Sequence, residues 1–261
     1  MVDIVTERSE GMLRVELNRP AKLNAMTSSM YTQLADIFND AANDERIRVV
    51  LWHGAGEAFC AGNDLEDFLK NPPGAGESPQ ARLMGALVEF EKPLIAAVHG
   101  AAIGGGTTML LHCDFVYAGE STRFQMPFIN LAVVPEFGST CLVPLRIGHL
   151  RAAELILLGL PFDAGRAAEL GLVTRIVSDR DPLEAATETA RKLAEKPAAA
   201  LQASKRLLKR SFREQTRAAM KAENEAFSER IRSEETKEAL TAFLEKRSPN
   251  FNKSNNPAAS T

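Results

Sequence analysis

Two nearly all-apolar segments, each followed by glycines and then by a helical pattern, most constrain the fold of this chain. The segments are IRVVLWHG, residues 47–54, and PLIAAVHG, residues 93–100. A strand that is apolar along its whole length is covered on both faces, as in a sheet flanked by helices. Because strand and helix patterns alternate along the chain, we expect the strands to pair in parallel within an α/β core.

The glycine-containing turns that follow these strands are candidate ligand sites. They read HGAGEAFCAGNDL (53–65) and HGAAIGGGTTM (99–109). Glycine lets the backbone approach a ligand closely, and the first N–H groups of a helix have no partner inside the helix. Either turn alone is equally compatible with tight packing. The pair favours a site in which two N–H groups reach one oxygen atom, which is an oxyanion hole.

The whole chain divides into an α/β core over residues 1–195 and a helical region over 196–261 that ends in a polar tail. Periodicity of the apolar residues predicts the individual elements. Besides the two buried strands, we expect two short strands around a turn within 4–20, helices at 28–44, 63–70, 81–91 and 103–114, strands at 115–119, 122–127 and 173–178, and helices at 151–160, 164–172, 181–196 and across 198–247. A Pro/Gly/Ser-rich loop at 71–79 is expected to be mobile.

Charge and cysteine usage exclude several classes of protein. The net charge of −3 gives no basic field for nucleic acid. No apolar run approaches the roughly 18 residues of a membrane helix, and the N-terminus lacks the pattern of a secretory signal. Cys60, Cys113 and Cys141 form no ligand cluster, so we expect buried reduced thiols, no metal site and a cytoplasmic protein.

Nucleotide-binding motifs are incomplete in this chain. The segment GAGEAF has Phe59 in place of the third glycine of GxGxxG, and no P-loop pattern occurs. The four histidines are scattered along the sequence, which favours structural roles for them. A dinucleotide or a nucleoside triphosphate is therefore a poor candidate for the ligand.

Glu136 is a lone carboxylate in the apolar stretch FINLAVVPEFGST, residues 128–140. Two interpretations are open. A glutamate beside Pro135 fits the first turn of a helix, and the residues alone favour this interpretation. The same residue also fits a base in an apolar pocket, where burial near Val133, Val134 and Phe137 would raise its pKa.

Taken in order, several motifs resemble the crotonase superfamily, also called the enoyl-CoA hydratase/isomerase family. The motifs are NRPAKLNAM, AFCAGNDL, PLIAAVHGAAIGGGTTM, CDFVYAGESTRFQMPFINLAVVPEFGS and RAAELILLGLPFDAGRAAELGLVTRIV, and the resemblance covers residues 4–250. It implies the crotonase-like fold, an α/β spiral of ββα units with a helical C-terminal region that assembles trimers or dimers of trimers. It also implies an acyl-CoA thioester as ligand, with coenzyme A as part of the substrate and no other cofactor.

The resemblance also implies roles for single residues. The oxyanion-hole donors match the backbone N–H groups of Asn63 and Gly105. The other expected contacts to substrate or coenzyme A are Lys22, Leu23, Ala61, Asp64, Leu65, Gly104, Thr108 and Phe128. Asp64 is also expected to cap or pair locally. Phe243 and Lys246 match a region that often reaches the coenzyme A of a neighbouring subunit, and a surface-helix role is equally compatible with them.

The expected reaction follows from which carboxylates are present. The hydratases that this chain resembles use two glutamates, and Thr108 and Phe128 occupy those positions here. We expect Thr108 to pack within its helix or to make a minor part of the pocket lining, and Phe128 to lie in the pocket wall or in the core. A carboxylate stands instead at Glu136, as in the Δ3,Δ2-enoyl-CoA isomerases of the peroxisomal type and their bacterial relatives. With this resemblance, the interpretation of Glu136 as a catalytic base is favoured. The expected activity is isomerisation of 3-enoyl-CoA to 2-trans-enoyl-CoA. The alternatives are enoyl-CoA hydration or another crotonase-type reaction, and a non-catalytic acyl-CoA-binding protein.

Overall fold

The computed structural model of the protein describes residues 2–70 and 78–251. The expected loop at 71–79 and the polar tail therefore lie largely outside the described residues. None of the helices within the described residues is long and apolar enough to cross a membrane.

The main sheet runs in the order β1-β2-β3-β4-β6-β9. Its strands are β1 (Ile4–Ser9), β2 (Met12–Leu17), β3 (Val49–Gly54), β4 (Leu94–Val98), β6 (Phe115–Gly119) and β9 (Arg175–Val177). Strands β1 and β2 form an antiparallel hairpin around Glu10 and Gly11, which both have positive φ. Every other pairing in this sheet is parallel, which confirms the prediction from alternating strands and helices.

Strand β3 shows why its sequence is apolar at every position. Val50 and Trp52 point into the larger core cluster, where Trp52 meets the ring of Phe38 edge-on at a centroid distance of 5.4 Å. Val49 and Leu51 point to the opposite face, into a smaller cluster with residues of α8 (Pro182–Ala194). Both faces are covered, so alternation of polar and apolar residues is absent.

A second, three-stranded sheet pairs β5 (Ala101–Ile103) with β7 (Arg123–Gln125) and β7 with β8 (Phe162–Asp163). The helices before it are α1 (Ser28–Asn43), α2 (Leu65–Lys70) and α3 (Pro79–Glu89), with the 3-10 turn η1 (Pro20–Lys22). Those at and after it are α4 (Gly105–Thr108), η2 (Met109–His112), η3 (Phe128–Leu131), α5 (Ser139–Ile147), α6 (His149–Leu157) and α7 (Ala164–Glu169).

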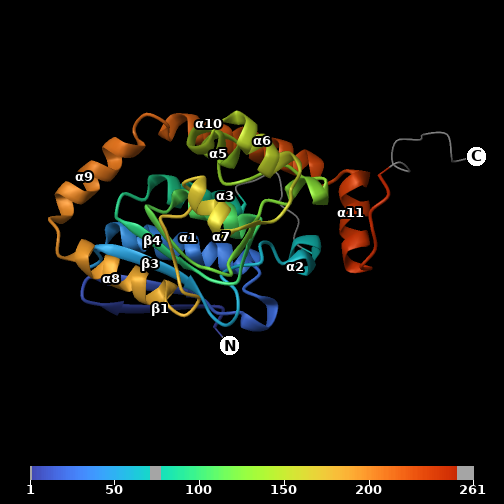
Figure 1. The fold of residues 1–261 in the computed structure, drawn as a ribbon. Helices are drawn as coiled ribbons and strands as arrows, with labels where there is room; N and C mark the ends of the chain where they lie inside the picture. The colour runs from blue at the N-terminus through green and yellow to red at the C-terminus, as the bar shows by residue number, and fades with distance from the viewer. Residues whose placement is uncertain (1, 71–77, 252–261) are drawn as a thin grey trace, which may run out of the picture.

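The C-terminal helices wrap back over the body of the molecule. Helix α9 (Ala198–Lys209) runs from α8, beside the sheet, to α10 (Arg213–Arg230) on the opposite side (Figure 1). Helix α10 packs against α3 and α5, and α11 (Glu234–Leu244) packs against η3 and lies at one end of the molecule near α2 (Figure 1). The division of the chain near residue 195 stays a prediction. It coincides with the end of α8 at Ala194.

Three expectations from the sequence are corrected by the structure. The helix expected over 103–114 is one short turn of α-helix followed by the 3-10 turn η2. Glu136 is not in a helix, because α5 begins at Ser139 with Gly138 as its cap, so the helix-start interpretation is wrong. Cys60 and Cys113 are buried as expected, whereas Cys141 is only partly buried.

Candidate active site

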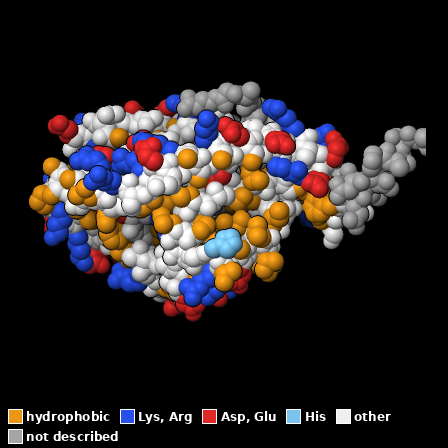
Figure 2. All heavy atoms as spheres, turned by 90° about the horizontal axis from the view of Figure 1, so that it is seen from above, with side chains coloured by type: hydrophobic (Ala, Val, Ile, Leu, Met, Phe, Trp, Pro, Cys, Tyr) orange, Lys and Arg blue, Asp and Glu red, His pale blue; other side chains and the backbone are white. Residues whose placement is uncertain are grey.

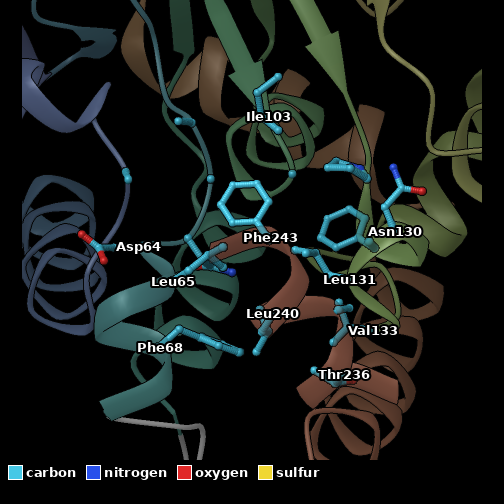
Figure 3. Close-up of a pocket in the computed structure, with 18 of the residues that line it drawn as sticks. Asp64, Leu65, Phe68, Ile103, Asn130, Leu131, Val133, Thr236, Leu240 and Phe243 are labelled. Carbon is cyan, nitrogen blue, oxygen red and sulfur yellow. The ribbon is translucent and has the colours of Figure 1, made fainter. Parts of the chain in front are cut away.

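A cavity of about 540 Å³ opens between the two glycine turns and the C-terminal helices. Its walls come from distant parts of the chain: the turn at 61–66, the turn at 103–105, η3, and residues of α2, α10 and α11. Figure 3 shows Phe243 and Leu240 of α11 facing Ile103 and Phe68 across this space. Most of the side chains that line the cavity are apolar, and the polar or charged ones are Lys22, Asn63, Asp64, Glu66, Gln125, Asn130, Thr236 and Arg247.

The two glycine turns lie side by side because their flanking backbones are hydrogen-bonded. The Cys60 N–H donates to the Ala101 carbonyl (3.0 Å), and the Ile103 N–H donates to the Cys60 carbonyl (2.9 Å). Two residues further on, the chain at 62–64 pairs with Met26. The backbone ladder therefore fixes the relative position of the two turns.

The N–H groups of Asn63 and Gly105 are left without acceptors in this arrangement. The bridge between Asn63 and Met26 is made by the Gly62 carbonyl, which accepts the Met26 N–H, and by the Asp64 N–H, which donates to the Met26 carbonyl. The N–H of Asn63 itself has no acceptor among the described residues. Gly105 is the first residue of α4, and its N–H has no acceptor in the described part of the chain either. Both residues line the cavity. Unpaired N–H groups at a cavity wall suit an oxygen that gains negative charge during a reaction.

Glu136 lies against the second of these residues. Its Oε1 atom is 2.8 Å from the position that a Cβ atom on Gly105 would take, so only glycine leaves room for the carboxylate there. The side chain is 4% exposed, and Oε1 has no hydrogen-bond partner in the described residues. A buried carboxylate oxygen without a partner is costly, which is typical of a functional group rather than a structural one.

The environment of Glu136 changes its acidity. Burial, and then the nearby charge of Glu223, raises the pKa of Glu136 to about 8, against the opposing effect of the Asn63 side chain. The direction agrees with the sequence-based expectation. A carboxyl group with a pKa near neutrality both accepts and returns protons readily.

Tyr31 joins this group from α1. Its hydroxyl donates to Asn63 Oδ1 at 2.6 Å and lies 3.2 Å from the Cβ position of Gly105. Burial, and then the charge of Glu136, raises the pKa of Tyr31 well above its ordinary value, so the hydroxyl stays neutral and a donor. Since Tyr31 occupies the amide oxygen, the Asn63 amide NH₂ is free to face the carboxylate.

Most of the residues that the sequence singled out meet at this cavity. Glu136 adjoins it through Gly105, and its lining includes Lys22, Ala61, Asn63, Asp64, Leu65, Gly104, Gly105 and Phe128. The carboxylate of Asp64 turns away from the centre of the cavity (Figure 3) and pairs with Arg19 at 2.9 Å. It also accepts the N–H groups of Glu66 and Asp67, so it caps α2, as expected.

Two predicted contact residues do not line the cavity. Thr108 is fully buried, and its hydroxyl donates to the Gly104 carbonyl at 3.3 Å within its own helix turn. Leu23 is 44% exposed, and its carbonyl accepts the Ala61 N–H at 2.9 Å. Phe243 lies at the cavity of its own chain, whereas Lys246 follows α11 outside the lining.

Sequence reasoning missed Tyr31, Glu223 and two phenylalanines, Phe68 and Phe227, whose rings meet edge-on at 5.8 Å in the cavity wall. Tyr31 and the phenylalanines occupy ordinary apolar positions of helices, so nothing in the sequence marks them. Glu223 could have been noticed in the sequence, because its spacing from Met220 and Phe227 places a charged residue on the buried face of α10.

Comparison with known proteins places these features in a family. The family model described as Enoyl-CoA hydratase/isomerase matches residues 7–254. A 1,2-epoxyphenylacetyl-CoA isomerase of Escherichia coli is 35% identical over 95% of this chain and 97% of its own length. A 2,3-dehydroadipyl-CoA hydratase of the same organism is 34% identical over 96% of this chain and 99% of its own length.

A solved structure gives the same result for the fold. An enoyl-CoA hydratase/isomerase from Pseudoalteromonas atlantica T6c superposes with a TM-score of 0.91 at 39% identity, covering 96% of this chain and all of that one. The α/β spiral with its helical C-terminal region is thus the crotonase fold, as the sequence motifs implied. From its sequence and its fold, the chain belongs to the enoyl-CoA hydratase/isomerase family.

Proposed function

We propose that this protein isomerises a 3-enoyl-CoA to the conjugated 2-trans-enoyl-CoA, with Glu136 as the single acid–base group. The observation that carries the proposal is the position of Glu136: a buried carboxylate with an unpartnered oxygen, packed against Gly105 beside two unpaired N–H groups. The acyl-CoA ligand is the one implied by membership of the family.

The proposed reaction moves one proton from C2 to C4. The thioester oxygen accepts the N–H groups of Asn63 and Gly105, which makes the C2 protons more acidic. The Glu136 carboxylate takes one C2 proton, the electrons of that C–H bond form a C1–C2 double bond, and the negative charge rests on the thioester oxygen of a dienolate that keeps its C3–C4 double bond. Protonated Glu136 then returns the proton to C4, which uses the electrons of the C3–C4 double bond. The carbonyl re-forms, the C1–C2 double bond moves to C2–C3 in conjugation with it, and the Glu136 carboxylate is regenerated.

The same geometry argues against hydration as the main reaction. Hydration requires an activated water and a proton donor for the α-carbon. At the two positions where the hydratases carry glutamates, this chain has the fully buried Thr108 and the apolar Phe128. One carboxylate suffices for a proton shuttle and leaves no second group to hold water.

A second candidate is isomerisation of an aromatic acyl-CoA, as the name of the Escherichia coli relative suggests. The observation that favours it is the wall of the cavity, which is lined by four phenylalanines: Phe68, Phe128, Phe227 and Phe243. Flat apolar walls suit an aromatic ring. Glu136 would again be the proton-transfer group.

The test compares wild type with Glu136→Gln on two substrates, a 3-enoyl-CoA and crotonyl-CoA. Growth of the conjugated thioester absorbance reports isomerisation, and its loss reports hydration. We expect wild type to convert the 3-enoyl-CoA to the conjugated product. Glu136→Gln should lose several orders of magnitude in kcat, because the glutamine amide is too weak a base to remove the C2 proton.

Other outcomes separate the rivals. Rapid loss of crotonyl-CoA absorbance would favour hydration. Binding of acyl-CoA by both proteins, with no turnover of either substrate, would favour a non-catalytic acyl-CoA-binding protein. If Glu136→Gln conjugates the 3-enoyl-CoA as fast as wild type does, Glu136 is not the base.

Assembly and location are part of the same proposal. The face seen in Figure 2 carries many hydrophobic side chains. Four leucines of α6 and its flanks are exposed, namely Leu150, Leu157, Leu158 and Leu160, and Leu150 is the most exposed of them at 83%. We propose a homotrimer or a dimer of trimers, which sedimentation equilibrium tests. Two buried free thiols suit a reducing compartment, and we propose the cytoplasm.

A further inference from the structure

The backbone directly after Glu136 adopts a costly conformation. Phe137 has a φ of +62° although it carries a side chain, and Gly138 follows with a φ of +68°. A left-handed conformation at a non-glycine residue costs on the order of 1 kcal/mol or more and persists only where the surroundings enforce it. The ring of Phe137 is fully buried beside Gly105. Contacts from other parts of the chain must therefore stabilise this turn, and the turn in turn orients the adjacent Glu136 carboxylate.

Glu223 of α10 holds the turn from one side. Its Oε2 accepts the Gly138 N–H at 2.7 Å, and its Oε1 accepts the Thr140 N–H at 2.8 Å and the Thr140 hydroxyl at 2.6 Å. The Glu223 side chain is 4% exposed, and it lies 85 residues along the chain from Gly138. Three donors on one buried carboxylate form strong, directional contacts.

His112 of η2 holds the turn from the other side. Its Nε2 atom lies 2.8 Å from the Phe137 carbonyl oxygen. A carbonyl only accepts, so Nε2 carries the hydrogen and donates. Burial, followed by the charge of Lys209, lowers the pKa of His112 to about 3, so the ring is neutral. Glu223 and His112 together hold the two polar ends of the one peptide group that joins Phe137 to Gly138.

We propose that Glu223 is a positioning residue, whose carboxylate fixes the turn at 137–140 and thereby holds the Glu136 carboxylate against Gly105. The proposal rests on the proposed role of Glu136 as the acid–base group. Without Glu223, Gly138 and Thr140 lose three hydrogen bonds, and the turn relaxes toward an ordinary conformation. Glu136 then leaves the position from which it reaches the substrate.

Glu223 has a second effect on Glu136, through its charge. The groups that face Glu136 are Tyr31 of α1, the thiol of Cys60, the amide of Asn63 and Glu223 of α10, while the ring of His112 behind the turn is neutral. Glu223 is the other carboxylate among them, and its charge adds to burial in raising the pKa of Glu136. Removing that charge therefore lowers the pKa of Glu136.

The test uses Glu223→Gln, with Glu229→Gln as the matched control, because Glu229 is an exposed glutamate of the same helix. The turnover of the 3-enoyl-CoA gives kcat and KM, and difference infrared spectra against Glu136→Gln give the titration midpoint of the Glu136 carboxyl group. In Glu223→Gln we expect kcat to fall about 10²-fold, the typical result of a small misplacement of a catalytic group. KM stays near the wild-type value, and the infrared midpoint moves to lower pH.

A purely structural role for Glu223 would lower the melting temperature and leave both readouts at the values of Glu229→Gln. The proposal is overturned if either kcat or the midpoint of Glu223→Gln equals that of Glu229→Gln. If Glu223→Gln does not fold, Thr140→Val decides. It removes one of the three hydrogen bonds and keeps the charge, so kcat should fall by about two- to tenfold with an unchanged midpoint. An unchanged kcat then overturns the proposal.

Failure of the proposed function is distinguishable from failure of this inference. If wild type does not turn over the 3-enoyl-CoA, the proposed function fails, and the infrared midpoint alone tests the contact between Glu223 and the turn. If wild type is active and Glu223→Gln matches the control, the proposed function stands and the positioning role is wrong.

Discussion

The two halves of the candidate site are held in place by different kinds of contact. The N–H groups of Asn63 and Gly105 are fixed by backbone bonds between neighbouring segments, such as Cys60 to Ala101. The turn that carries Glu136 is fixed by side chains from η2 and α10. The difference teaches that the oxyanion donors tolerate side-chain changes nearby, whereas the base depends on residues far along the chain. Breaking each kind of contact should give different kinetic signatures.

After Glu136→Gln, the largest effect is expected for Gly105→Ala, because its side chain would displace the carboxylate that lies beside an oxyanion donor. The added Cβ would lie 2.8 Å from Glu136 Oε1 and 3.2 Å from the Tyr31 hydroxyl, so the carboxylate must move. We expect kcat to fall about 10²–10³-fold, the scale seen when one oxyanion donor is lost. Steady-state turnover of the 3-enoyl-CoA measures it.

Gly85→Ala is the matched control for that substitution. Gly85 lies in α3, and a Cβ atom there meets no heavy atom within 4 Å. Alanine in a helix interior is favoured over glycine by roughly 0.5–1 kcal/mol. The variant should therefore be fully active and slightly more stable, and loss of activity would show that any methyl group in this chain is disruptive.

The pH dependence isolates the Glu136 half. Since the pKa of Glu136 is raised to about 8, the basic form is the minor one at neutral pH. We expect kcat/KM to fall about tenfold for each pH unit below that value, as for a single base. A profile that is flat from pH 6 to 9 in wild type would contradict this role of Glu136.

Stability should vary with pH in the opposite direction. A carboxyl group whose folded-state pKa is raised stabilises the fold below its unfolded value, near 4.5, and loses that contribution as pH rises toward about 8. Thermal melts of wild type and Glu136→Gln test this. The variant should gain stability relative to wild type on going from pH 5 to pH 9, and a constant difference would argue that the carboxyl group is not desolvated.

Tyr31→Phe should have the smallest effect of the substitutions at the site. It removes the 2.6 Å hydrogen bond to Asn63 Oδ1 and keeps the buried ring. We expect a loss of about 1 kcal/mol in stability and at most about a tenfold loss in kcat, because the Asn63 backbone N–H stays in place. A loss as large as that of Gly105→Ala would mean that the hydroxyl itself contacts the substrate.

Local sequence signals predicted the paired turns of the backbone-fixed half of the site, whereas Glu136 was favoured as the base only through the family resemblance. Asn63 and Gly105 follow apolar strands and glycines, and these local signals gave both the parallel sheet and the paired turns. The residues alone favoured a helix start at Glu136, because Pro135 and a following glycine fit one, and only the resemblance favoured a base. Only tertiary packing sets α5 to begin at Ser139 and leaves the carboxylate buried.

The residues that support Glu136 were hidden for a related reason. Glu223 and His112 reach the turn at 137–140 across long stretches of sequence, and no periodicity records such a contact. A glutamate in a core position of α10 was the one readable sign. Thr108 was expected either to pack in its helix or to line the pocket, and the short α4 turns its hydroxyl back onto the Gly104 carbonyl, in agreement with the packing role.

The central claim is that one carboxyl group carries one proton from C2 to C4. The most direct test is a single turnover of a 3-enoyl-CoA deuterated at C2, in ordinary water, with the product analysed for deuterium at C4. Because the Glu136 side chain is only 4% exposed, its acquired deuteron exchanges slowly with solvent. The account predicts deuterium at C4 with wild type and no conjugated product with Glu136→Gln. Conjugated product from Glu136→Gln, or wild-type product without deuterium at C4, would contradict it.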